Sequence, residues 1–143
     1  MNSNGKKYLV FSLQDSTFAL DLDHVAEVGD LPEVSPIPLA PSCYIGALSF
    51  HGNIVAVINL AELLGISTAV PAGKIIVLHQ EHVSLAFIVD SVLRIVSESD
   101  TTIRPLPDNT SLVSAALSLP EGEASVLNPT TLAYEAEIAL FKK

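Results

Sequence analysis

The stretch KYLVFSLQDSTFALDLD, residues 7–23, decides the fold. Apolar side chains recur at every second position on both sides of a polar turn at Asp15, for example at Leu9 and Leu20. Alternation with a period of two is typical of a strand that buries one face. Two such runs joined by a short polar turn predict a β-hairpin.

Further hairpins follow from the same alternation. The paired runs are residues 46–50 with 54–60, 74–79 with 83–92, and 114–119 with 124–127. Between them we expect a strand over residues 24–28, an extended proline-rich segment over 32–41 and one helical turn over 61–64. Residues 97–109 are expected to be irregular. Asn128-Pro129, a cap followed by a first-turn proline, predicts a C-terminal helix.

The two halves of the chain look like copies of one plan. Residues 7–11 match residues 74–78 at an offset of 67 (74 minus 7), and residues 47–50 match residues 116–119 at an offset of 69 (116 minus 47). The order of the matching elements agrees throughout. Because each half holds few strands, the repeat predicts two small barrels that hide their own edges.

The composition excludes several classes of function. The chain has 143 residues, enough for one domain, and is 49% hydrophobic but only 16% charged. Either the core is large or apolar surface is left for a partner. A net charge of −9 repels phosphate backbones and anionic lipid surfaces. We therefore expect no nucleic-acid binding and no direct membrane insertion.

Chemically reactive side chains are few and scattered. Cys43 is the only cysteine, which suits a reducing compartment, and the polar start lacks the apolar run of a secretion signal. We therefore expect a cytoplasmic protein. Phosphate-binding glycine motifs and nucleophile-elbow motifs are absent from the sequence, and His79 with His82 offers too few ligands for zinc. We expect no catalytic residue, no metal and no cofactor.

An ordered set of motifs covers nearly the whole chain. The motifs are Leu9-Val-Phe-x-Leu, Phe18-Ala-Leu-Asp-Leu-x-x-Val25-x-Glu27-Val28, Pro38-x-x-Pro41-x-x-x-x-Gly46, His51-Gly52-x-Ile-Val-x-Val-Ile-x-Leu60 and Val89-Asp90-x-Val92. In this order they resemble the CheW-like domain family over roughly residues 8–140. The ordered set is more specific than any one motif.

The resemblance implies a mainly β fold in which two small five-stranded SH3-like barrels share a hydrophobic core, with a short C-terminal helix. A single domain would span residues 1–143. Its parts would be a flexible start (1–7), a first barrel half (8–65), a linker (66–73), a second barrel half (74–128) and the helix (129–143).

The resemblance also implies a non-catalytic adaptor, which couples the cytoplasmic tip of chemoreceptors (methyl-accepting chemotaxis proteins) to the regulatory domain of a CheA-type histidine kinase. An amphipathic receptor helix needs an apolar groove with a polar rim. The residues expected to bind partners, by position, are Val25, Glu27, Val28, Ile45, Phe50, His51, Val55 and Val57. For Val25, Val28 and Val57, packing in the core is equally compatible with the sequence.

Four positions depart from the family pattern. Family members usually carry Asn-Leu-Arg-Gly where this chain has Ser49-Phe50-His51-Gly52, and often Asp in place of Asn59. Arginine is permanently charged and planar, whereas a histidine with its reference pKa of about 6.5 is mostly neutral at pH 7. The departures predict an altered partner surface, as in a specialised or accessory coupling protein.

Two other readings of the sequence make different structural predictions. A small-ligand-binding β-barrel would contain an interior pocket with converging polar groups. A hydrolase that used Cys43 would need an accessible thiol near a histidine.

Overall fold

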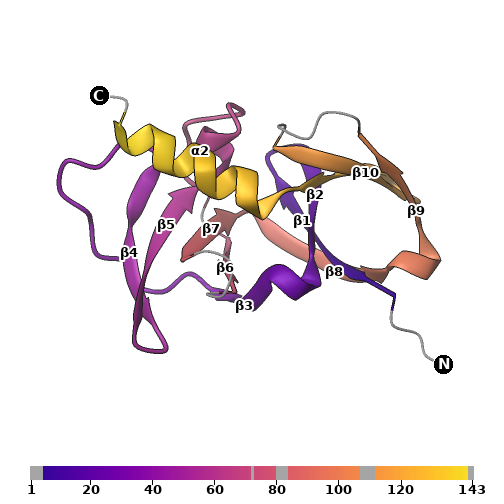
Figure 1. Cartoon of the computed structure of the whole chain (residues 1–143), viewed down its shortest axis with the longest axis horizontal. Helices are drawn as coiled ribbons and strands as arrows, with labels where there is room; N and C mark the ends of the chain where they lie inside the picture. Colours follow the sequence, from indigo (N-terminus) through magenta and orange to yellow (C-terminus); the bar gives the residue numbers. More distant parts are fainter. Residues whose placement is uncertain (1–4, 72, 80–83, 107–111, 142–143) are drawn as a thin grey trace.

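The computed structural model describes residues 5–71, 73–79, 84–106 and 112–141. It is built from short strands with one longer helix at the C-terminus (Figure 1). The strands are β1 (Lys7–Leu13), β2 (Ser16–Asp21), β3 (Val25–Asp30), β4 (Tyr44–Phe50), β5 (Asn53–Asn59), β6 (Lys74–Leu78), β7 (Leu85–Val89), β8 (Ser91–Ser97), β9 (Thr102–Pro105), β10 (Val113–Leu119) and β11 (Gly122–Leu127). The helices are α1 (Leu60–Leu63) and α2 (Pro129–Phe141), with 3₁₀ turns η1 (Leu22–His24) and η2 (Glu98–Asp100).

Within the described residues, the strands form one sheet of six and one of five. The orders are β8-β1-β2-β11-β10-β9 and β3-β6-β7-β5-β4. Neighbouring strands are antiparallel except for β2 with β11 and β5 with β7, which are parallel. The two sheets form two SH3-like barrels side by side, and α2 lies along one side of the molecule in Figure 1. The mainly β fold is confirmed, with a sixth strand in one barrel.

Each barrel takes strands from both halves of the sequence. The hairpin β1-β2 joins β8 to β11, whereas β6-β7 joins β3 to β5. The expected division into a first barrel half (8–65) and a second barrel half (74–128) therefore does not coincide with the two barrels. Which barrel a strand joins depends on its pairing with strands that are distant in the sequence. Alternation within a strand carries no information about these pairings.

The sequence repeat reappears in the register of the strands. Val10 lies opposite Ala19 in the six-stranded sheet, and their equivalents Val77 and Ala86 lie opposite each other in the five-stranded sheet. The parallel pairs repeat in the same way: Val126 lies beside Ala19, and its equivalent Val57 lies beside Ala86. The two barrels are thus built on the same pairing plan.

The extra strand β9 has a reduced counterpart in the proline-rich segment. Arg104 of β9 pairs with Ala116, and Ser35 forms an isolated bridge with Ala47. Both pairs are related by the offset of 69 (104 minus 35 and 116 minus 47). The extended course expected for residues 32–41 agrees with this bridge. The strand β9 was not predicted, because four residues that end in a proline give little alternation.

The chain crosses between the sheets at Asp90. The strand expected over 83–92 ends at Val89 in one sheet, and β8 begins at Ser91 in the other. The Asp90 backbone N–H donates to the Ser12 carbonyl at 3.0 Å, which ties the crossing to β1. A Cβ on Gly73 would lie 1.8 Å from the Asp90 carbonyl oxygen, so only glycine fits there.

The helix ends follow the sequence signals. The Asn128 side chain accepts hydrogen bonds from the backbone N–H groups of Thr130 and Thr131, and so caps α2. The Asn59 side chain accepts one from Glu62 and caps α1. Gly65, with φ of +76°, follows α1 in the left-handed conformation expected of a helix-ending glycine.

A central core lies between the barrels, and each barrel also has a smaller core of its own. The fully buried members of the central core include Phe11, Leu13, Leu20, Ile58, Leu60, Ile76, Leu78, Phe87 and Leu132. They come from both sheets and both helices, so the barrels cannot separate without exposing this core to water.

A candidate partner-binding surface at the edge of the five-stranded barrel

The strand β3 forms an exposed edge of the five-stranded sheet. Among the described strands it pairs only with β6. Val25 and Val28 lie opposite Leu78 and Ile76, which belong to the central core, so both valines share that face. A register shift between Val25 and Glu27 makes this possible, since residues three apart otherwise point to opposite faces.

The three predicted residues of β3 differ in accessibility. Val25 is partly buried against the central core, Val28 is 36% exposed and Glu27 is exposed on the opposite face of the strand. Glu27 forms no ion pair or hydrogen bond with the part of the chain that the structure describes. The edge therefore offers apolar side chains on one face and a carboxylate on the other.

One ion pair lies at the far end of this edge. Lys74 Nζ lies 2.5 Å from Asp30 Oδ1, across the pair of strands β3 and β6. The hydrogen bond from Lys74, followed by its positive charge, lowers the pKa of Asp30 below its ordinary value. The pair is exposed, so its contribution to stability is small.

The hairpin β4-β5 carries His51 at its tip. His51 and Gly52 both have positive φ angles, +50° and +83°, as in the two-residue turns that fit the twist of a hairpin. The His51 side chain is exposed, and its ring lies edge-on to the Phe50 ring at a centroid distance of 4.2 Å. His51 is therefore available to a partner, whereas half-buried Phe50 also packs against the core of the five-stranded barrel.

The expected role of Val55 and Val57 does not fit their position. Both are 0% exposed and belong to the core of the five-stranded barrel, against which Ile45 is half-buried. Both faces of β5 meet apolar neighbours, so alternation alone could not tell which face is accessible. Ile54, which the family pattern did not single out, is instead 72% exposed on the other face. Ile54 would be assigned to the accessible face if the alternation along β5 were shifted by one residue.

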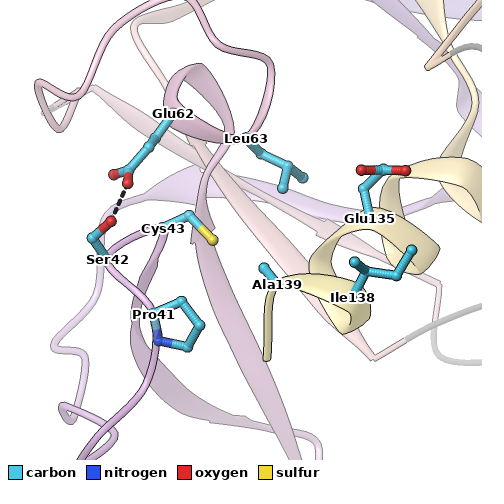
Figure 2. Close-up of a pocket in the computed structure, with 8 residues that line it drawn as sticks. All are labelled: Pro41, Ser42, Cys43, Glu62, Leu63, Glu135, Ile138 and Ala139. Carbon is cyan, nitrogen blue, oxygen red and sulfur yellow. Dashed lines mark hydrogen bonds between the residues drawn. The ribbon is translucent and has the colours of Figure 1, made fainter. Parts of the chain in front are cut away.

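A cavity lies beside Cys43, between α1, α2 and the chain before β4 (Figure 2). Its volume is about 300 Å³, and carboxylates of Glu62 and Glu135 line it. The Ser42 hydroxyl donates a hydrogen bond to Glu62. Cys43 is 6% exposed, and burial raises the pKa of its thiol. A buried, protonated thiol is a poor nucleophile, and no histidine lines this cavity among the described residues.

The remaining histidines form no metal centre within the described ranges. His79 follows β6, and its backbone N–H donates to the His24 carbonyl at 2.8 Å. His82 lies outside the described residues. No group of three potential ligands among His, Cys, Asp and Glu comes together in the described part of the chain. No described helix is both long and apolar enough to span a bilayer.

The family model for the CheW-like domain matches residues 7–137. The chain belongs to the CheW-like domain family. The chemotaxis protein CheW of Rhizobium meliloti is 26% identical over 110 residues, which cover 76% of this chain and 71% of that protein. The chemotaxis protein CheW of Thermotoga maritima is 34% identical over 86 residues, which cover 59% of this chain and 57% of that protein.

The fold of this CheW-like chain is also found in a solved structure. The scaffolding protein TtCheW from Thermoanaerobacter tengcongensis superposes with a TM-score of 0.78 at 25% identity, covering 90% of this chain and 92% of that one. This CheW-like domain is thus a member of a chemotaxis scaffold family with a two-barrel fold.

Proposed function

We propose that the chain is a non-catalytic cytoplasmic adaptor that couples chemoreceptor tips to the regulatory domain of a CheA-type histidine kinase. Its family membership and the names of its relatives support this role. The observation that carries the proposal is the exposed edge of β3, where Val25 and Val28 border the central core and Glu27 is free to pair with a partner.

The β3 edge suits an amphipathic helix. A helix laid along it would cover Val28 and the accessible part of Val25 with its apolar stripe, and a basic residue at its margin would meet Glu27. His51 and Ile54, on the neighbouring hairpin, add a ring and an aliphatic side chain that are both accessible. Val55 and Val57 are omitted from this surface because they are buried.

The environment of Cys43 supports a role in binding rather than catalysis. Cys43, the one nucleophilic thiol of the sequence, is buried and its pKa is raised. A small-ligand-binding barrel is the alternative function. The interiors of both barrels are filled mainly by aliphatic side chains, which disfavours a ligand in the interior.

The test compares equivalent positions on the two edge strands. Val28→Asp should weaken binding to a receptor cytoplasmic-tip fragment at least about tenfold in calorimetry, because it places a charge at the centre of the apolar contact. Ile95→Asp is the matched control: Ile95 is the counterpart of Val28 on β8 and is 53% exposed. Equal losses in the two variants would refute the assignment of the β3 edge.

Two further measurements complete the test. His51→Arg should tighten receptor binding, because it restores the permanent charge of the family pattern. In a pull-down from its own cytosol, the unaltered chain should retain a CheA-type kinase. Failure to retain any such kinase or to bind any receptor tip would contradict the adaptor role as a whole.

A further inference from the structure

A small polar cavity occupies one end of the six-stranded barrel. Its volume is about 200 Å³, and it opens where β1 begins and where β2 and β11 end. Lys6, Tyr8, Asp21, His24 and Ser114 contribute its polar walls. None of these residues takes part in the proposed receptor surface, so the cavity is separate from that surface.

Tyr8 is one of the residues that line this cavity. The residue is 6% exposed and belongs to the core of the six-stranded barrel. Its hydroxyl makes no hydrogen bond to any residue that the structure describes, and the hydroxyl oxygen is not fully buried, so it is accessible to a group bound in the cavity. Burial raises the pKa of Tyr8, which keeps the group neutral. A neutral hydroxyl in the wall of a cavity is left for a ligand.

Asp21 supplies a fixed negative charge. It lies opposite Tyr8 across β1 and β2, and its side chain is only 14% exposed. Its Oδ1 accepts a hydrogen bond from the Asp23 backbone N–H at 3.0 Å, which holds the carboxylate in place. Lys6 Nζ lies 3.5 Å from Oδ2, but the Lys6 side chain is 58% exposed. Lys6 is therefore a loosely held cation that another cation can replace.

The equivalent end of the five-stranded barrel shows that the fold does not require this polarity. The offsets of 67 and 69 carry Tyr8 onto Ile75, Asp21 onto Ile88 and Ser114 onto Ile45. Ile75 and Ile88 are at most 3% exposed, and all three isoleucines pack in the barrel core. Three polar residues at one end thus replace three isoleucines at the other.

We propose that this end of the six-stranded barrel binds a small organic cation with an ammonium or guanidinium head. The Asp21 carboxylate would pair with the head, and the Tyr8 hydroxyl and ring face would complete its contacts. The net charge of −9 favours cations at every approach. An anion would instead have to approach the Asp21 carboxylate, which repels it. The site is independent of the proposed adaptor role.

The test uses the intact chain and an NMR titration with methylguanidinium chloride, matched for ionic strength with potassium chloride. Resonances of Tyr8, Asp21 and Asn128 should shift and saturate. Asp21→Asn keeps the hydrogen bond to Asp23 but removes the charge, and should weaken binding at least about tenfold. Asp15→Asn, which removes the same charge from the exposed turn at the other end of β2, should have no effect.

Three outcomes would overturn the proposal: saturation at the same affinity in Asp21→Asn, no shifts at these residues, or larger shifts with sodium acetate. Lys6→Ala should tighten binding about two- to fivefold, because it removes the competing cation. If Asp21→Asn fails to fold, Tyr8→Phe tests the same site by removing only the hydroxyl, with a loss of affinity as the expected result.

The same titration with N-acetylarginine amide distinguishes the source of the cation. Binding more than about tenfold tighter than methylguanidinium would assign the site to an arginine side chain presented by a polypeptide. Equal affinity would assign it to a free small molecule.

Discussion

The two barrels share one pairing plan but differ at their ends and edges. Val10 with Ala19 and Val77 with Ala86 occupy the same register in the two sheets. At one barrel end, however, Asp21 stands where the other barrel has Ile88. Strand pairing thus sets the architecture, whereas a few side chains at ends and edges give each barrel its own chemistry.

The largest expected effect comes from exchanging these two end positions. Ile88→Asp places a carboxylate at a site that is 1% exposed and lined by aliphatic side chains, and should lower the free energy of unfolding by more than about 3 kcal/mol. Asp21→Ile removes the side-chain cap of the 3₁₀ turn η1 and should cost no more than about 1 kcal/mol. Urea unfolding followed by circular dichroism measures the free energy of unfolding of both variants. Equal losses in the two variants would contradict the difference between the two barrel ends.

An intermediate effect is expected at a close contact found in only one barrel. A Cβ on Gly46 would lie 2.3 Å from the Ser35 carbonyl oxygen, whereas the equivalent position in the other barrel is Ala115. Gly46→Ala should therefore destabilise the chain by about 1–3 kcal/mol. Ala115→Gly should cost less than about 1 kcal/mol. Thermal unfolding of both variants is the measurement, and a neutral Gly46→Ala would contradict the described course of residues 32–41.

The smallest effect concerns an ion pair that only the five-stranded sheet has. Asp30 faces Lys74 there, whereas Ser97 faces Lys7 at the equivalent place. Lys74 lowers the pKa of Asp30, so the stabilisation is present above the ordinary carboxyl pKa of 3.8 and is lost as the pH falls through the lowered value. Asp30→Ser should be slightly less stable than the unaltered chain at pH 7, and the difference should vanish in acid. A difference that persists at low pH would have another cause.

Local patterns predicted the hairpins and the helix caps, because alternation and turn residues act between neighbours in the sequence. The exchange of strands between barrels was not predicted, since Asp90 carries no glycine or proline signal for a change of sheet. At the candidate surface, alternation correctly placed Val55 and Val57 on one face. It could not show that this face is buried, because Ala56 and Ile58 on the other face also pack in a core.

Each barrel takes strands from both halves of the sequence, and this limits how the gene can recombine. A breakpoint within residues 66–73 leaves no fragment with a complete set of strands. The hairpin β1-β2 pairs with strands of the second half of the sequence, and β6-β7 pairs with strands of the first half. Gene fusion or recombination at this point therefore cannot transfer a self-sufficient module. The smallest heritable unit of this fold is the whole domain, although its sequence consists of two copies of one plan.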